Sequence, residues 1–137
     1  MEKIIVTEEI IWLAEKRIKE IPLLKGSILG EPAKVIGEIG EVLFENFIKA
    51  NGLTVRKEKN QKPDFFFFIT LVREKGVIIE GYLLGAINLP NLLTKGEAWE
   101  KGEVDARNGK VVSHSCVNIE IKDLVSNDEF INILKGE

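Results

Sequence analysis

The chain is poor in the residues that build disulfides, zinc sites and thiol active sites. Cys116 is the only cysteine and His114 the only histidine among the 137 residues. One cysteine cannot form an internal disulfide, so nothing indicates an oxidising compartment. A zinc site normally requires four ligands, and no second pair at a suitable spacing joins His114 and Cys116. Residues two apart on a strand also lack the direct hydrogen bond and the oxyanion pocket of a Cys-His nucleophile.

Long apolar runs and targeting patterns are missing as well. No apolar run reaches the roughly eighteen residues of a transmembrane helix, and the N-terminus has no signal-peptide pattern. We therefore expect an intracellular, cytoplasmic protein that does not contact a membrane. With 137 residues, of which 45% are hydrophobic, the chain is expected to form a single domain over residues 1–137.

A formal net charge of −3 argues against a surface that is basic throughout. One local basic run does occur, interrupted by Glu58, and consists of Arg56, Lys57, Lys59 and Lys62. These side chains could bind the phosphates of DNA or RNA, although solvated charges beside a strand are equally ordinary. Abundant Glu and Lys with a single glutamine, Gln61, are typical of thermophile proteins.

Hydrophobic periodicity predicts an α/β fold of α+β-like character, with a central mixed or antiparallel sheet flanked by helices. The helices are expected at Thr7 to Ile21 and Ala33 to Asn51, and the strands at Thr54 to Lys59, Phe65 to Val72 and Val77 to Leu84. Because the second of these strands is apolar on both faces, we expect it to be central, with its phenylalanines in the core or in a subunit interface.

The remainder of the chain is less regular. Residues 88–110 are expected to form an irregular excursion with a short helical turn, followed by a tight turn at Asn108-Gly109. Alternation then predicts a strand over Lys110 to Lys122, and Ser126 is expected to cap a final short helix. Trp12 and Trp99 are interpreted as packing anchors.

The second helix contains two glycines and three glutamates. Gly37 and Gly40 each cost up to about 1 kcal/mol relative to alanine, which either close packing or the approach of a ligand would explain; we favour packing. Glu38, Glu41 and Glu45 follow helical spacing, which is typical of a solvated acidic stripe. Glu41 lies nearest the apolar boundary and is the better candidate ligand.

The chain contains, in this order, a helix with Glu38 and Glu41, then Pro63-Asp64, an apolar strand, a turn, and a strand with Glu80-Gly81-Tyr82. This order resembles the core of PD-(D/E)XK, or restriction-endonuclease-like, nucleases. The resemblance implies hydrolysis of phosphodiester bonds with Mg²⁺ or Mn²⁺. It implies metal ligands among Glu38, Glu41, Asp64 and Glu80. The family's lysine two residues after the second acid is Tyr82 here, whose neutral phenol cannot replace an ammonium group. A displaced lysine such as Lys57 would have to assist.

One subgroup of that family, found in viruses and microbes, is more closely similar. It resembles this chain over Gly26 to Glu41, Asn60 to Phe68, Glu80 to Tyr82, Lys101 to Glu103, Arg107 to Gly109 and Ile119 to Leu124. In that subgroup the catalytic hairpin falls between the first and second of these blocks, where this chain has only Leu53 to Lys59. On this alignment the catalytic hairpin is deleted and Asp64 begins a structural strand. We prefer this interpretation, although it conflicts with Asp64 as a ligand.

The deletion implies a catalytically inactive relative, without a cofactor, that binds nucleic acid or a protein partner. The alternative is an Mg²⁺-dependent nuclease that uses Glu41, Asp64, Glu80 and Lys57. Loss of a hairpin would expose strand edges, so we also expect a homodimer. Because that subgroup occurs in viruses, the expected cytoplasmic location includes the cytoplasm of an infected host cell.

Overall fold

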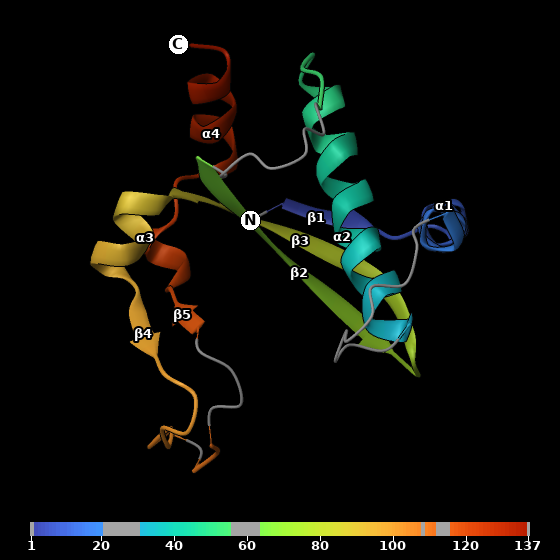
Figure 1. Ribbon diagram of the computed structural model, residues 1–137. Helices are drawn as coiled ribbons and strands as arrows, with labels where there is room; N and C mark the ends of the chain where they lie inside the picture. Colours follow the sequence, from blue (N-terminus) through green and yellow to red (C-terminus); the bar gives the residue numbers. More distant parts are fainter. Residues whose placement is uncertain (1, 21–30, 56–63, 108, 112–115, 137) are drawn as a thin grey trace.

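The computed structural model describes residues 2–20, 31–55, 64–107, 109–111 and 116–136. These residues form a mixed α+β fold of four helices, a three-stranded antiparallel sheet and a small hairpin (Figure 1). The predicted fold class is confirmed, and the sheet is antiparallel rather than mixed. The elements are β1 (Glu2–Ile5), α1 (Glu8–Glu20), α2 (Glu31–Ala50), β2 (Phe65–Glu74), β3 (Val77–Asn88), α3 (Leu89–Lys95), β4 (Glu97–Trp99), β5 (Cys116–Asn118), a 3₁₀ turn (Ile121–Asp123) and α4 (Asn127–Leu134).

The sheet has the strand order β1-β3-β2, so β3 is its central strand. Pairing of β2 with β3 runs from Phe65 opposite Asn88 to Glu74 opposite Val77. On the other side, β1 pairs with β3 from Glu2 opposite Leu83 to Ile5 opposite Glu80. The prediction that Phe65 to Val72 is the central strand is therefore wrong. The four-residue strand β1, which pairs with β3 on the side away from β2, was too short to give a periodic signal.

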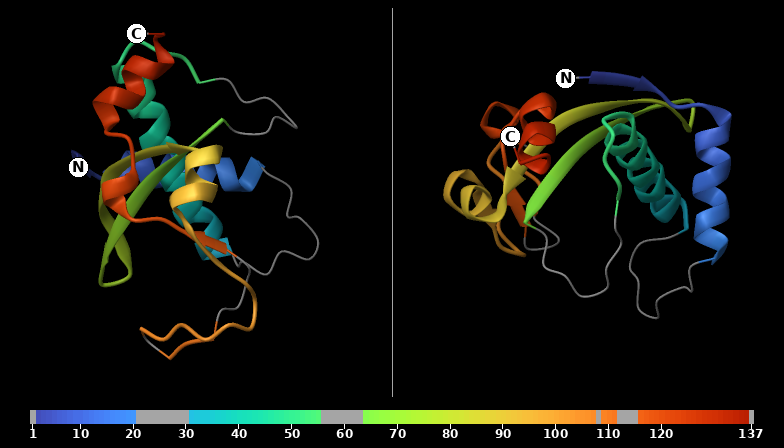
Figure 2. Two further views of the ribbon diagram at one scale, coloured as in Figure 1. Left: turned by 90° about the vertical axis from the view of Figure 1, so that its left-hand side faces the viewer. Right: turned by 90° about the horizontal axis from the view of Figure 1, so that it is seen from above.

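Helix α2 lies across one face of the sheet, and α1 packs beside α2 (Figures 1 and 2). Ile39 and Leu43 of α2 are buried against the sheet. Gly81 allows this contact, since a Cβ there would lie 2.7 Å from Leu43 Cδ1. None of the described helices is long and apolar enough to cross a membrane.

A cluster of phenylalanines joins α2, β2 and α4. Phe67 of β2 lies 5.1 Å from Phe44 and 5.3 Å from Phe130, measured between ring centroids. Phe65 and Phe47 complete the cluster at 5.5 Å from Phe130 and Phe67 respectively. The predicted final helix is confirmed as α4, and the Ser126 side chain caps it by accepting a hydrogen bond from the Glu129 backbone N–H. These contacts hold the start of β2 against α2 and α4.

The segment after β3 differs in part from the prediction. The short helical turn is confirmed as α3, which Asn88 caps. The continuous strand over Lys110 to Lys122 is wrong: within the described residues only Cys116–Asn118 is a strand, and a 3₁₀ turn occupies Ile121–Asp123. The strand that pairs with β5 is β4, which has only three residues. The alternating sequence pattern therefore extends beyond the residues that can pair. At the earlier predicted strand, residues 54–55 are irregular and residues 56–59 lie outside the described part.

The two tryptophans differ in their surroundings. Trp12 is 61% exposed, so its interpretation as a packing anchor is wrong. Its ring instead lies 5.3 Å from the Lys16 ammonium, a cation-π contact at the surface. Trp99 is partly buried, and the Arg107 guanidinium lies 5.8 Å from its ring.

Candidate functional site

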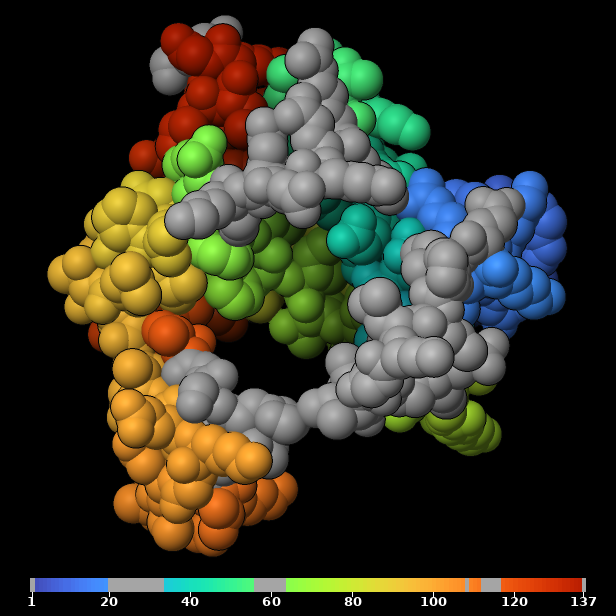
Figure 3. Space-filling view, in the orientation of Figure 1, coloured from blue at the N-terminus to red at the C-terminus, as the bar shows by residue number. Residues whose placement is uncertain are grey.

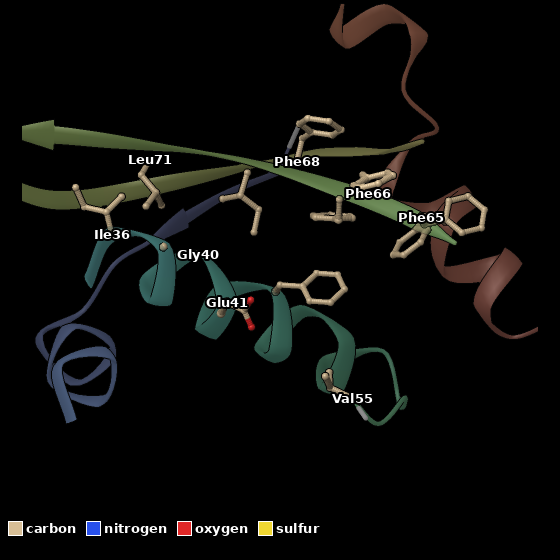
Figure 4. A pocket seen from close by; sticks show the side chains of 13 residues that line it. Ile36, Gly40, Glu41, Val55, Phe65, Phe66, Phe68 and Leu71 are labelled. Carbon is tan, nitrogen blue, oxygen red and sulfur yellow. The ribbon is translucent and has the colours of Figure 1, made fainter. Parts of the chain in front are cut away.

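An apolar groove with a volume of about 810 Å³ runs between α2 and β2 (Figure 4). Aromatic and aliphatic side chains supply most of the described wall, and Glu41 is the only charged residue among the described residues that line it. The lining residues are Ile36, Gly37, Gly40, Glu41 and Phe44 of α2, Val55, Phe65 to Ile69 and Leu71 of β2, and Phe130 of α4. Figure 3 shows atoms of β2 at the surface beside those of α2.

The groove follows the edge of β2. Five consecutive residues, Phe65 to Ile69, line it, although successive side chains of a strand point to opposite faces. Residues of both faces line one groove only where the groove runs along the edge of the strand. In the described part of the chain, β2 pairs with β3 alone. Its other edge therefore presents backbone N–H and C=O groups to the groove.

Gly37 and Gly40 form part of the α2 wall of this groove. A Cβ at either position would meet no atom of the described residues within 4 Å. The close packing that we favoured as the reason for these glycines is not found in the described structure. Their effect is to leave the groove wider where α2 passes Leu71 and Ile69, because no side chain projects there.

The acidic residues that the nuclease resemblance implies as metal ligands lie in separate places. Glu41 is exposed on α2, and Asp64 is exposed directly before β2. Glu80 lies on the opposite face of the sheet, because its neighbour Gly81 faces Leu43 of α2 and side chains alternate along β3. Among the residues that the structure describes, no three His, Cys, Asp or Glu side chains gather closely enough to hold a metal ion.

Glu80 interacts with groups of its own face. Tyr82 donates a hydrogen bond to Glu80 Oε1 at 3.3 Å, which confirms that the two side chains share one side of the strand. Lys3 Nζ of β1 lies 3.9 Å from Glu80 Oε2. This ammonium group is partly exposed, as is the carboxylate, with 54% and 22% of the side-chain surfaces accessible. A pair so open to water contributes little to stability.

Glu38 and Glu45 bind Arg17 and do not form a solvated stripe. Arg17 Nη2 donates to Glu45 Oε2 at 2.6 Å, and Nη1 donates to Glu38 Oε1 at 3.3 Å. The hydrogen bond that Arg17 donates to Glu45 is the largest influence on the pKa of Arg17 and raises it, ahead of the opposing effect of burial and of the bond donated to Glu38. Glu45 is only 6% exposed, so the pair holds α1 to α2. The expected acidic stripe is wrong for these two residues.

The basic run cannot be placed relative to the groove. Arg56, Lys57, Lys59 and Lys62 all lie outside the described residues, as does His114. Their predicted roles therefore stay predictions. The groove itself was missed from the sequence, although Gly37, Gly40 and the four phenylalanines were visible signals. The phenylalanines were interpreted as core or interface residues of a central strand, whereas they belong to an edge strand.

Comparison with known proteins gives no family for this chain. No family model matches it, and searches of curated proteins and of solved structures find no significant match. The function is therefore inferred from the groove and the carboxylates of this chain alone.

Proposed function

We propose that this chain is a non-catalytic protein-interaction module that binds an extended polypeptide segment along the edge of β2 that is unpaired among the described residues. The single observation that carries the proposal is the groove of about 810 Å³ beside that edge. Its apolar walls suit alternate side chains of a bound strand, and the free edge supplies backbone hydrogen bonds. This combination favours an extended ligand over a helix, which satisfies its own backbone groups internally.

The placement of the carboxylates supports a non-catalytic role. A nuclease of the resembling family needs acids that hold a hard divalent cation and a nearby cation to assist. Here Glu80 and Glu41 lie on different faces of the sheet, and Glu38 is engaged by Arg17. Descent from a PD-(D/E)XK nuclease that lost its catalytic hairpin remains our proposal for the origin of the chain.

Nucleic-acid binding is the second candidate, favoured by the four basic residues within residues 56–62. Binding of this kind would weaken steeply as salt is raised, because phosphate contacts release counterions. Replacing Lys57 and Lys59 by glutamine would then reduce the slope of log affinity against log salt. Equal slopes for the variant and the parent chain would remove this candidate.

A cleavage assay tests the absence of catalysis. Single- and double-stranded DNA and RNA are incubated with the protein and Mg²⁺ or Mn²⁺, beside an Asp64→Ala variant. We expect no cutting above that of the variant. Metal-dependent cutting that Asp64→Ala abolishes would refute the proposal and support the alternative site of Glu41, Asp64, Glu80 and Lys57.

A peptide selection tests the groove. A display library is panned against the protein immobilised at low density, with Gly40→Leu to fill the groove and Gly40→Ala as the matched control. Because a Cβ at Gly40 meets open space, we expect the alanine variant to retain binding. The leucine variant should bind selected peptides at least about tenfold more weakly, equivalent to about 1.4 kcal/mol. Equal binding by both variants would place the peptide site elsewhere.

A further inference from the structure

We propose that the strand that pairs with β2 is the β2 strand of a second copy, so that two sheets join edge to edge. This proposal depends on the proposed function, because it names the polypeptide that occupies the groove. The two copies would be related by a two-fold axis perpendicular to the sheet. Each copy contributes its three strands to one continuous antiparallel sheet.

The two edges of the sheet differ in their protection against pairing. Edge strand β1 has four residues, among them Glu2 and Lys3. A short, charged edge is one of the ways in which proteins prevent association of sheets. The opposite edge, β2, has ten residues and carries no charge from Phe65 to Val72. An apolar stretch from Phe65 to Val72 without charges or proline is suited to pairing.

Symmetry limits how two copies of β2 can pair. Antiparallel pairing about a perpendicular two-fold axis places α2 of both copies on the same face of the joined sheet. Odd-numbered residues of one β2 strand therefore lie opposite odd-numbered residues of the other, and even-numbered residues lie opposite even-numbered ones. Phe68 opposite Phe68 places Phe67 opposite Ile69 and Phe65 opposite Leu71. Arg73 and Glu74 then lie beyond the paired segment. Centring the axis on Ile69 would instead place Asp64 opposite Glu74, which like charges disfavour.

The favoured register also fills the groove. It places Phe65 and Phe67 of the second copy beside Leu71 and Ile69 of the first, on the α2 side of the sheet. Leu71 and Ile69 line the groove together with Gly37 and Gly40, where added side-chain atoms meet open space. Two aromatic rings therefore enter the part of the groove that the glycines leave wide.

A two-fold dimer uses both free β2 edges at once. Such a closed contact ends with two subunits, whereas a head-to-tail contact between different edges would continue into a fibre. Burial of the apolar groove would stabilise the pair in proportion to the area removed from water. A second copy therefore supplies a strand of the same length and the same apolar character as β2, and the two-fold axis pairs the two edges in a closed contact.

Sedimentation velocity tests the dimer. We expect the wild-type chain to be dimeric at about 100 µM, a concentration at which micromolar affinity is enough. Phe66→Lys, which places a charge on the groove edge of β2, should be monomeric there. Ile5→Lys is the matched control, because Ile5 is 61% exposed on the protected edge, and it should remain dimeric. A monomeric wild type, or a dimeric Phe66→Lys that keeps the circular dichroism of the parent, would overturn the proposal.

Spin labels test the edge-to-edge pairing without a destabilising change. Thr70, which is exposed on β2, is replaced by cysteine in a Cys116→Ser background and labelled. In the favoured register the two labelled positions are offset by four residues along the strand, or about 13 Å before the label arms are added. We expect a label separation below about 30 Å, and a separation beyond about 45 Å would refute the pairing of the two β2 edges. A monomeric wild type that still binds selected peptides would refute the dimer and leave the proposed function intact, whereas selected peptides that bind Gly40→Leu and Gly40→Ala equally would refute the function in either oligomeric state.

Discussion

At the scale of single residues, the glycines separate into those that fill a structural need and those that widen the groove. Gly85 has a φ of +133°, and a Cβ there would collide with the Val125 carbonyl oxygen. That close approach accompanies the backbone pairing of Ala86 with Val125. Gly40, by contrast, lies in a helix with open space beside it. The same substitution should therefore have opposite effects at these two positions.

We predict that Gly40→Ala raises the free energy of unfolding by about 0.5 to 1 kcal/mol, since alanine has the better helix propensity. Gly85→Ala should lower it by about 2 kcal/mol or more, because both the backbone conformation and the contact with Val125 are lost. Urea denaturation measures both variants. A destabilising Gly40→Ala would indicate that the glycine is required by packing after all.

Arg17 of α1 binds two glutamates of α2. Arg17→Met should reduce the free energy of unfolding by about 3 kcal/mol, because it removes the 2.6 Å ion pair with the buried Glu45 carboxylate. Adding Glu45→Met should recover part of that loss, since the Glu45 carboxylate is then no longer buried in the absence of the Arg17 guanidinium. Thermal and urea unfolding of the single and double variants check this. A double variant less stable than Arg17→Met would contradict the explanation.

At the scale of elements, α4 and the phenylalanine cluster hold the start of β2 in place. Phe130→Ala should cost about 3 to 5 kcal/mol, because Phe130 is 3% exposed and contacts both Phe65 and Phe67. Ile133 of the same helix is 40% exposed, so Ile133→Ala should cost less than about 1 kcal/mol. Equal losses in denaturant unfolding would show that α4 is not anchored by its aromatic residue.

The hairpin after β4 should respond to acid through Asp105. Hydrogen bonds from the Arg107 side chain, and then from its backbone, lower the pKa of Asp105 below its ordinary value. A lowered pKa means that the contact stabilises the turn above the ordinary aspartate range and is lost as pH falls through the folded-state pKa. Trp99, whose ring lies 5.8 Å from Arg107, reports this loss by fluorescence in a Trp12→Phe background. An Asp105→Asn variant should lack the transition.

Sequence patterns predicted those elements whose signals are local. The 3.6-residue period of Ile39, Leu43 and Phe47 located α2, and Ser126 located the start of α4. The position of β2 at the edge was not predictable, because apolar side chains on both faces of Phe65 to Val72 are typical of a central strand. In the structure an apolar groove lies beside part of this strand. The bridge from Arg17 to Glu38 and Glu45 was equally hidden, since it joins residues 21 and 28 positions apart.

At the scale of the whole molecule, the sheet carries helices on one face and leaves one long strand edge unpaired among the described residues. The elements of the nuclease resemblance are present, as a glutamate-bearing helix and two adjoining strands. Glu41 and Glu80, however, lie on different faces of the sheet, and no three His, Cys, Asp or Glu side chains of the described residues gather into a metal site. The β2 edge that is unpaired among the described residues is the surface on which the function that we propose would act.

Residue-resolved amide hydrogen exchange along β2 tests this account most directly. In an antiparallel edge strand, every second N–H bonds the neighbouring strand and the others face outward. The account predicts that alternate amides between Phe65 and Glu74 exchange rapidly in dilute protein and become protected when a selected peptide is added or the protein is concentrated. Uniform protection of β2 in dilute protein, or alternate amides that stay unprotected in both conditions, would contradict it.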